Sequence, residues 1–483
     1  MPKFAFIGCG PTTIGATFRI HELIKEGKLN KDDVEVNIVE LQKVPGGLAT
    51  SVVDEAGFAW DMGVHIHADP SKYPCFTRCI EDAVKQWNFI RRCVKADMAH
   101  IFCDDDARDE ENNKLNPYVP YPVQMAVPLF PPKIRDACMR DLKHVQAEKF
   151  DEKPKDFGEW TYRAFGQCLQ DIFVRPYNKK VWTVTLEEMN SHWVGDRVAT
   201  VNVAQLEEMS KKSRAELEKD DLGWGPNQFF RYPQKLTGCG FTWRAVCGRQ
   251  PQEWFHYEHE AVKVDAKGQK LIARDKNSEK EVSFGYDYLL STMPITLLGK
   301  ITGLAPDIGL QHSKVVLVGL GLRKPQPEFY ANVNWAYYPA DDLVFYRCTF
   351  LSNFNDVITP NAKQYWSVVV EIGMQPDAHV DEELLIEKTI DGLMSRDVFA
   401  SRDQVVDRWS TLLPYGYPIP TVNRDPELRK AHTALKPYNI YSRGRFGGWK
   451  YEVANQDHSF AQGYEWVDHI LYGEKEQVYD AMA

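Results

Sequence analysis

The first forty residues alternate between short apolar runs and a helical pattern. Residues 3–7 form an apolar run typical of a strand, and a glycine turn separates them from apolar residues at helical spacing that continue to Ile24. Gly27 is placed to end that helix. Residues 34–39 predict a second strand, which leads into Glu40. A strand, a tight turn, a helix and a second strand are the elements of a dinucleotide-binding fold.

The part of the chain between residues 72 and 221 carries mostly helical patterns. Residues 72–100 look helical, and residues 156–171 carry aromatic side chains at helical spacing. Residues 207–221 are highly charged and predict either a helix or a linker. Residues 175–182 interrupt the helices, and their polar, proline-containing sequence predicts a rigid turn.

Strand patterns dominate the next part of the chain, and a helix follows them. Residues 255–284 alternate as in a hairpin, and residues 286–294 predict a strand that returns to the nucleotide-binding sheet. Three later runs predict an antiparallel sheet, at residues 315–320, 343–350 and 366–371. The proline-rich residues 413–420 predict an ordered loop that presents two tyrosines. Residues 457–471 predict a helix, with Asp457 or Ser459 as its cap.

Glycines in the first turn favour a nucleotide ligand. Gly8 permits the turn, and Gly10 lets the backbone approach a pyrophosphate. Thr13 stands where the third glycine of the usual fingerprint lies, and Gly15 comes two residues later. Glu40 is the acidic residue that we expect to bind the hydroxyls of a ribose. Although two glycines alone are a weak signal, their place between a strand and a helix favours a bound nucleotide.

A second glycine turn distinguishes between two nucleotide cofactors. Gly46, Gly47 and Leu48 follow shortly after Glu40. In flavoproteins such a turn passes the ribityl chain and the pyrophosphate, whereas a domain that binds NAD alone has no need of it. The sequence therefore favours FAD over NAD.

A glycine run near the C-terminus combines backbone access with hydrogen-bond donors. This run and the helix start that follows supply six candidate ligands, namely Gly444, Arg445, Tyr451, Asn455, Gln456 and Ser459. The N-terminus of a helix carries partial positive charge, so this start suits a phosphate or the electron-rich pyrimidine edge of a reduced flavin. A capped surface helix after a turn is the alternative interpretation.

Composition narrows the classes of function. The chain has 483 residues, 43% of them hydrophobic and 12% aromatic, which suffices for a large core in two or three domains. No apolar stretch is long enough to span a bilayer, so we expect a soluble, cytoplasmic protein without a membrane partner. The ten cysteines form no CxxC or CxxH pair, which argues against zinc or another metal. The formal net charge of −10 disfavours nucleic acid as a partner.

Taken together, these runs resemble the UDP-galactopyranose mutase family, in its long eukaryotic branch, from the first predicted strand to the last predicted helix. Besides the glycine turns, the matching runs are Gly-Val-His at 63–65, Arg-Pro-Tyr-Asn at 175–178, Asn-Trp-Ala-Tyr-Tyr-Pro at 334–339, Phe-Tyr-Arg at 345–347 and Gly-Arg-Phe-Gly at 444–447. Such a set is far more specific than any one of its members.

The resemblance implies an α/β protein with three domains. A Rossmann-type FAD-binding domain would be discontinuous and comprise residues 1–75, 224–305 and 436–483. Residues 76–223 would form a helical domain for substrate binding and a possible homo-oligomer, and residues 306–435 an antiparallel sheet domain.

The family's reaction interconverts UDP-galactopyranose and UDP-galactofuranose. The resemblance implies that N5 of the reduced flavin attacks the anomeric carbon, that UDP leaves, and that UDP returns after the sugar ring has closed through O4. No net electrons are consumed. The expected partner is thus a UDP-sugar, and NADPH or NADH is the expected source of the reduced flavin.

The resemblance also assigns roles to individual residues. Arg347 and Arg445 would bind the diphosphate, and Arg175 would complete the pocket when the flavin is reduced. His65 would lie beside flavin N5. Further substrate contacts would come from aromatic and amide side chains, namely Trp335, Tyr337, Tyr417, Tyr451 and Asn455. Considered singly, each arginine has a surface salt bridge as its alternative, and each aromatic residue a place in the core.

Three residues depart from the family pattern. Val64 replaces the second glycine before the flavin histidine, and its Cβ restricts the backbone there. Phe354 stands where a substrate-facing tyrosine is expected, so that sugar selectivity is open. Cys239 replaces a glycine in a glycine-rich loop. These changes indicate a divergent branch of the family.

Two other functions stay open. The first is a related flavoenzyme that acts on another nucleotide sugar as a mutase or an oxidase, and a need for stoichiometric reductant would reveal it. The second is a binding protein of the GDP-dissociation-inhibitor type, which shares the architecture without flavin chemistry. Glu40, the glycine pair at 46–47 and His65 argue against the second function, and a colourless purified protein would favour it.

Overall fold

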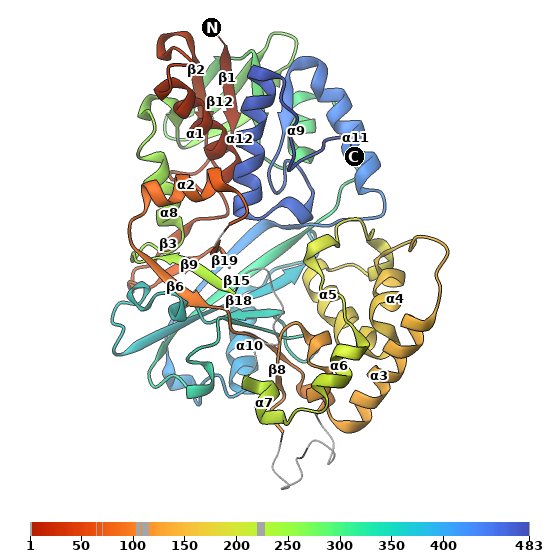
Figure 1. Ribbon diagram of the computed structural model, residues 1–483. Helices are drawn as coiled ribbons and strands as arrows, with labels where there is room; N and C mark the ends of the chain where they lie inside the picture. The colour runs from red at the N-terminus through yellow and green to blue at the C-terminus, as the bar shows by residue number, and fades with distance from the viewer. Residues whose placement is uncertain are drawn as a thin grey trace.

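A five-stranded parallel sheet forms one end of the molecule (Figure 1), in the order β10-β2-β1-β14-β20. The computed structural model describes residues 2–63, 65–69, 71–102, 108, 115–219 and 228–482. The strands are β1 (Lys3–Ile7), β2 (Glu35–Val39), β10 (Phe255–His256), β14 (Tyr288–Ser291) and β20 (Ile440–Ser442). The strand predicted at residues 286–294 is β14, and it pairs with β1. The sheet therefore unites segments from the start, the middle and the end of the chain.

Helices α1 (Pro11–Lys25) and α12 (Gln456–Tyr472) pack side by side against this sheet (Figure 1). Two glycines permit the close approach. A Cβ on Gly15 would lie 2.0 Å from the carbonyl oxygen of Phe460, and one on Gly463 would lie 1.8 Å from that of Thr12. Neither position tolerates a side chain while the two backbones stay in contact.

Smaller elements surround the parallel sheet. They are the hairpin strands β11 (His259–Asp265), β12 (Lys270–Asp275) and β13 (Glu281–Gly285), and the helices α2 (Pro74–Ala83), α8 (Gly240–Cys247), α9 (Ile295–Thr302) and α11 (Arg424–Leu435). The pair β3 (Ser51–Val53) and β4 (Ala59–Asp61) packs instead against the second large sheet, where Trp60 stacks on Trp409 at 5.7 Å. The predicted helix at residues 72–100 is wrong beyond Ala83. Strand β6 (Trp87–Arg91) pairs there with β9 (Phe229–Pro233), which also pairs with β5 (His67–Asp69).

The second large sheet has seven strands in the order β19-β15-β18-β17-β16-β7-β8. They are β7 (Val94–Asp97), β8 (Tyr118–Pro120), β15 (His312–Arg323), β16 (Trp335–Tyr337), β17 (Arg347–Thr349), β18 (Tyr365–Met374) and β19 (Val405–Pro418). Neighbours are antiparallel except β16 and β7, which are parallel. The loop predicted at residues 413–420 is instead mostly the end of β19, because an edge strand tolerates proline.

Alternation along β15 divides the core into two layers. Val316, Val318 and Leu320 pack in one cluster, which includes buried side chains of helix α10 (Glu382–Met394). Val315 and Leu317 face the opposite side, toward the parallel sheet, and both line the large cavity described below. This period of two is what a strand with both faces buried requires.

The helical part of the molecule lies beside the second sheet (Figure 1). It contains α3 (Pro132–Ala147), α4 (Phe157–Leu169), α5 (Arg175–Trp182), α6 (Val203–Met209) and α7 (Arg214–Lys219). The rigid turn predicted at residues 175–182 is wrong, because these residues form the helix α5, which continues directly from a π-helical turn at Gln170–Val174. Pro176 lies just after that turn. Among the described residues, no helix has both the length and the apolar character that a bilayer crossing needs.

Candidate functional site

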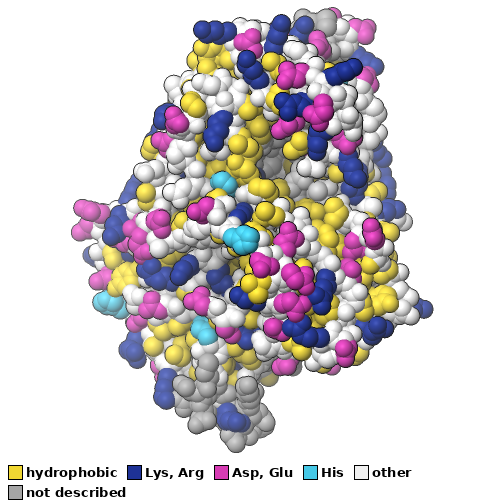
Figure 2. All heavy atoms as spheres, turned by 180° about the vertical axis from the view of Figure 1, so that it is seen from behind, with side chains coloured by type: hydrophobic (Ala, Val, Ile, Leu, Met, Phe, Trp, Pro, Cys, Tyr) yellow, Lys and Arg dark blue, Asp and Glu magenta, His cyan; other side chains and the backbone are white. Residues whose placement is uncertain are grey.

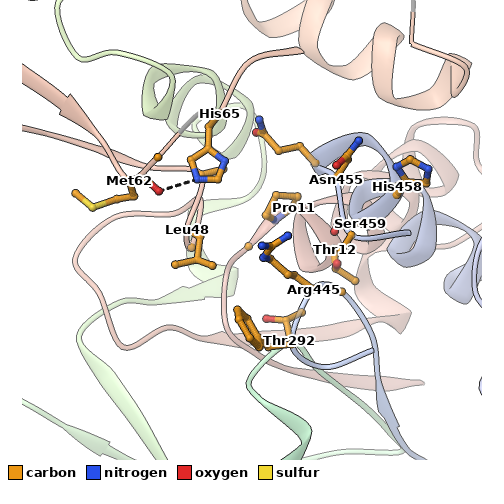
Figure 3. A pocket seen from close by; sticks show the side chains of 18 of the residues that line it. Pro11, Thr12, Leu48, Met62, His65, Thr292, Arg445, Asn455, His458 and Ser459 are labelled. Carbon is orange, nitrogen blue, oxygen red and sulfur yellow. Dashed lines mark hydrogen bonds between the residues drawn. The ribbon is translucent and has the colours of Figure 1, made fainter. Parts of the chain in front are cut away.

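A cavity of about 2100 Å³ lies between the parallel sheet, the start of α12 and one face of the seven-stranded sheet. Pockets for a single small ligand usually measure roughly 300–1,000 Å³. The cavity therefore has room for two ligands. Figure 3 shows His65, Arg445 and the first residues of α1 and α12 around it. On the face of the molecule seen in Figure 2, acidic and basic side chains are interspersed, so an anionic ligand depends on cations within the cavity itself.

The first glycine turn forms one wall of the cavity. Gly8 has a φ of +87°, and a Cβ there would lie 2.3 Å from Oγ1 of Thr292. A Cβ on Gly10 would meet no atom within 4 Å, so it would occupy ligand space. Gly10 is also the N-cap of α1, and no side chain caps this helix. The turn thus offers a bare helix N-terminus beside an open backbone.

Glu40 lies at the rim of the same wall. Its carboxylate accepts hydrogen bonds from the backbone amides of Cys9, at 2.6 Å, and of Gln42, at 2.7 Å. Burial raises the pKa of this carboxyl. The two amides fix its position between the first and second glycine turns.

The second glycine turn packs directly against the first. Gly46 has a φ of +114° and its amide donates to the carbonyl oxygen of Cys9 at 2.8 Å. Gly47 has a φ of +56°, and a Cβ there would lie 3.4 Å from Cα of Gly10. Gly47 and Leu48 line the cavity. The two turns together form one continuous backbone surface.

The C-terminal run closes the cavity opposite these turns. Gly444 has a φ of +84°, and its amide donates to the side chain of Gln462 at 2.8 Å. Asn455 is the N-cap of α12 by its backbone, but its side chain makes no capping bond. The prediction that Asp457 or Ser459 caps this helix is therefore wrong. Ser459 lies in the first turn and lines the cavity.

Gln456 connects the helix start with two other elements. Its Oε1 accepts from the indole nitrogen of Trp243 at 2.8 Å, and its Nε2 donates to the carbonyl oxygen of Ile66 at 3.4 Å. It therefore fixes the loop that carries His65 against α12, in addition to lining the cavity.

Three predicted cofactor residues do not line the cavity, and one of them is Gly46, whose amide bonds to the carbonyl oxygen of Cys9. Thr13 is fully buried and does not belong to the cavity wall. Gly15 lies at the contact between α1 and α12, where it allows the backbones to meet. Gly15 therefore contributes to helix packing, whereas Thr13 lies almost opposite it on α1, buried in the core.

The residues present fit FAD. The wall contains two helix N-termini whose N-cap residues make no side-chain capping bond, a glycine whose missing Cβ leaves open space, and a fixed carboxylate at the end of β2. Uncapped helix N-termini suit phosphates and anionic ring edges, and the carboxylate suits ribose hydroxyls.

His65 lies between this wall and the arginines of the cavity. Its Nε2 donates to the carbonyl oxygen of Met62 at 3.0 Å, as the dashed line in Figure 3 marks. Burial, aided by the positive charge of Arg445, lowers the pKa of His65 to about 4. The ring is therefore neutral at pH 7, and Nδ1 is left as an acceptor.

Arg347 is a partly buried cation on the opposite wall, with 17% of its side chain exposed. Its guanidinium forms a two-pronged pair with Glu371, with Nε to Oε1 at 2.8 Å and Nη2 to Oε2 at 2.6 Å. Nη2 also donates to the Tyr417 hydroxyl at 3.5 Å. Although burial opposes it, the Glu371 carboxylate raises the pKa of Arg347 well above its usual value. The group is a permanent charge that is fixed in direction.

Arg445 and Tyr451 lie next to this pair. The Arg445 guanidinium is 4.9 Å from the ring centre of Tyr417 and 5.5 Å from that of Tyr451. Both arginines thus contact Tyr417: Arg347 bonds to its hydroxyl, and Arg445 lies over its ring. Trp335 also lines the cavity, where its indole packs 5.5 Å from the ring of Phe230. Of the predicted substrate residues, the structure brings together Trp335, Arg347, Tyr417, Arg445, Tyr451 and Asn455.

Two predicted substrate residues lie elsewhere. Arg175 forms an ion pair with Glu187 at 2.8 Å and donates to Gln170 at 3.2 Å, and it lines a separate pocket of about 550 Å³. Tyr337 packs 4.7 Å from the ring of Tyr121 and 5.0 Å from that of Tyr177. Neither residue lines the large cavity. The predicted recruitment of Arg175 on flavin reduction stays a prediction.

Of the three residues that depart from the family pattern, the two that the structure describes lie in different parts of the molecule. Phe354 is 1% exposed and packs between Tyr232 and Trp335, behind the cavity wall. The amide of Cys239 donates to Asp61 at 3.1 Å, in a fully buried part of the core. Val64 lies outside the described residues.

Sequence reasoning missed two residues of the site. Glu371 is the one carboxylate in the apolar strand β18, and such an isolated charge is a usable signal because a buried charge needs a partner. Arg197, from a 3₁₀ turn at Gly195–Arg197, bonds to the side chain of Asn455 at 2.9 Å. The sequence around Arg197 contains no motif that indicates a ligand-binding residue.

No protein-family model matches the sequence. The chain is similar to a crystal structure of reduced UDP-galactopyranose mutase, with 33% identity, a TM-score of 0.86, and coverage of 99% of this chain and 96% of the other. It is also similar to an oxidoreductase from Methanosarcina mazei, at 14% identity, a TM-score of 0.60 and coverage of 96% and 99%. A fatty acid isomerase from P. acnes matches at 12% identity, a TM-score of 0.59 and coverage of 97% and 99%. These last two proteins share the fold alone, and the predicted α/β fold class is confirmed.

Proposed function

We propose that this chain, which belongs to the UDP-galactopyranose mutase family, interconverts UDP-galactopyranose and UDP-galactofuranose. The observation that carries the proposal is the pair of arginines around Tyr417, in a cavity larger than one cofactor needs. Membership of this family, together with a fold shared with flavoenzymes, supports a flavin-dependent isomerase. The arginine pair supports a nucleotide diphosphate as the second ligand.

The cofactor would be held by the backbone of the two glycine turns, Glu40 and the start of α12. When it is bound and reduced, FAD supplies a nucleophilic ring nitrogen for the anomeric carbon of the sugar. We propose NADPH or NADH as the reductant. Because the reaction consumes no net electrons, a single reduction would serve many turnovers.

The protein's own task is to hold the leaving diphosphate and to keep water away. Arg347 and Arg445 would bind its oxygens, and they must do so against a formal net charge of −10. Glu371 orients Arg347 for this contact while it neutralises part of its charge. A diphosphate that stays bound lies close to the anomeric carbon for the return step, so the catalytic gain is one of position and electrostatics.

His65 would act without a charge of its own. Since its pKa lies at about 4, it stays neutral beside the cationic arginines. Its Nδ1 can accept a hydrogen bond from the reduced flavin or from a sugar hydroxyl. A neutral ring here avoids repulsion with Arg445, whose charge is needed for the diphosphate.

The test is an anaerobic incubation of the purified protein with UDP-galactofuranose and dithionite, followed by chromatography for UDP-galactopyranose. We expect yellow protein and conversion only in the reduced sample. Arg347→Ala should abolish conversion, and Arg408→Ala should not, because Arg408 pairs with Glu387 on the outer surface of the same sheet. Protein that is yellow before reduction, and that shows no conversion after reduction, would refute the proposal and favour another nucleotide sugar or a net oxidation. Colourless protein would favour a binding protein.

A further inference from the structure

Asn455 is the N-cap residue of α12, but its side chain does not cap the helix. Asparagine is among the strongest N-cap residues, because its side-chain oxygen accepts from an amide of the first turn. Asn455 occupies the N-cap position with a φ of −68° and a ψ of 166°, yet it forms no such bond. The His458 amide donates to Asp457 instead. The Asp457 amide is thus the group that the Asn455 side chain would cap.

Arg197 binds the side-chain oxygen of Asn455 that such a cap would use. Its Nη1 donates to Oδ1 of Asn455 at 2.9 Å and so withdraws that oxygen from the helix. The rest of the guanidinium is anchored on the backbone, at 3.0 Å from the carbonyl oxygen of Tyr451 and at 2.9 Å from that of Glu452. The planar fork of arginine can serve these three acceptors at once, which the ammonium of lysine cannot do in the same geometry.

The same guanidinium also positions an aromatic ring. Its carbon lies 5.0 Å from the ring centre of Tyr451, and Arg445 lies 5.5 Å from that centre. Trp182 adds an edge contact at 4.9 Å. The Tyr451 ring therefore contacts two cations near the start of α12, where Figure 3 shows Asn455, His458 and Ser459 around the cavity.

We propose that Arg197 is a positioning residue that keeps the N-terminus of α12 open for the anionic edge of the reduced flavin. It does so by holding the Asn455 side chain away from the helix. The inference rests on the proposed flavin-dependent function and names the residue that prepares its cofactor site. An open helix end stabilises the reduced, negatively charged flavin more than the neutral oxidised form. Arg197 should therefore raise the reduction potential of the bound flavin.

The test begins with Arg197→Ala. In this variant Asn455 is free to cap the helix, and we expect a tenfold loss of preference for the reduced flavin. For a two-electron couple this corresponds to a potential about 30 mV lower. The double variant Arg197→Ala with Asn455→Ala lacks the competing cap, so its potential should return toward that of the unmodified protein. A merely structural role of Arg197 would not produce this recovery.

Arg214→Ala is the matched control. Arg214 also binds backbone carbonyl oxygens, those of Leu129 at 2.8 Å and Asn116 at 2.9 Å, but outside the cavity. Its loss should leave the potential unchanged. Arg197→Lys retains the charge and should lower the potential in the same direction, which keeps the test informative if the alanine variant folds poorly.

A crystal structure of Arg197→Ala makes the outcome independent of the cofactor. We expect Oδ1 of Asn455 within hydrogen-bond distance of the Asp457 amide. An Asn455 side chain that stays in place, or an unchanged potential after it has rotated, would overturn the inference. Colourless unmodified protein would refute the proposed function instead, and the position of Asn455 would still decide whether Arg197 controls the cap.

Discussion

The two halves of the cavity are built from different materials. The half that we propose for the cofactor, called the cofactor half below, is made mainly of backbone, from two glycine turns and two helix starts, and each of these comes from a short stretch of sequence. The half that we propose for the substrate, called the substrate half, is made of side chains, and its arginines and tyrosines come from β17, β19 and the C-terminal run. A backbone site depends on local conformation, whereas a side-chain site depends on which strands become neighbours. Mutations should therefore affect the two halves in different ways.

The largest effect should come from the substrate half. Arg347→Ala leaves the buried carboxylate of Glu371 without its partner, and the free energy of unfolding should fall by about 3–5 kcal/mol. The double variant Arg347→Ala with Glu371→Gln removes the stranded charge, so it should recover most of the stability but none of the activity. Urea unfolding and anaerobic turnover measure the two effects separately. Full recovery of activity would contradict a role of Arg347 in diphosphate binding.

In the cofactor half, alanine substitutions at two nearby glycines should affect stability and cofactor binding separately. Gly8→Ala places a Cβ against Thr292 at a φ of +87°, and it should cost about 1–3 kcal/mol of stability. Gly10→Ala meets no protein atom, so it should leave stability unchanged while its methyl group enters the cofactor space. We expect FAD affinity to fall at least tenfold in Gly10→Ala, measured by flavin fluorescence during titration of the apoprotein. Equal effects on stability in both variants would contradict this difference.

Arg175 tests whether the substrate half changes with the state of the flavin. Its side chain is 39% exposed and pairs with Glu187, so Arg175→Ala should change the free energy of unfolding by less than about 1 kcal/mol. If Arg175 joins the cavity on reduction, the variant should bind UDP normally when oxidised and several-fold more weakly when reduced. Calorimetry with UDP in both states measures this. Equal affinities in both states would refute the recruitment of Arg175.

A further prediction concerns the protonation of two histidines that line the cavity. Burial lowers the pKa of His65 and of His67 to about 4, from an ordinary value of 6.5. The unfolded chain therefore binds protons that the folded protein does not, and stability should fall as the pH drops from 6.5 toward 4. Above pH 6.5 these two groups should contribute no slope. Thermal unfolding between pH 4.5 and 8 measures the slope, and His67→Gln should reduce it.

The difference between the halves also explains what the sequence predicted well. Gly8, Gly10, Gly47 and Glu40 were recognisable because their chemistry depends on a turn and a strand end within a few residues of each other. The cofactor wall contains all four residues. Thr13 and Gly15 belong to the same motif, but Thr13 is buried in the core and Gly15 meets α12, and only the packing of distant elements determines that.

Long-range pairing accounts for most of the errors in the fold. Residues 87–97 form β6 and β7 rather than a helix, because β9 and β16 supply their partners from more than a hundred residues away. Tyr337 shows the same limitation within the site. It lies on β16 next to Trp335, and in this sheet its ring turns to Tyr121 instead of the cavity. Glu371 was overlooked because a strand pattern does not tell which cation meets its lone charge.

The packing of α1 against α12 has a consequence for how the protein is made. One wall of the cavity comes from the first residues of the chain, and the wall beside it from residues 444–459. On the ribosome, the first glycine turn emerges early, but it must wait for almost the whole chain before its second wall exists. FAD therefore cannot stabilise the nascent parallel sheet during most of synthesis. Cofactor capture should be a late event, completed only after α12 has left the exit tunnel and docked beside α1.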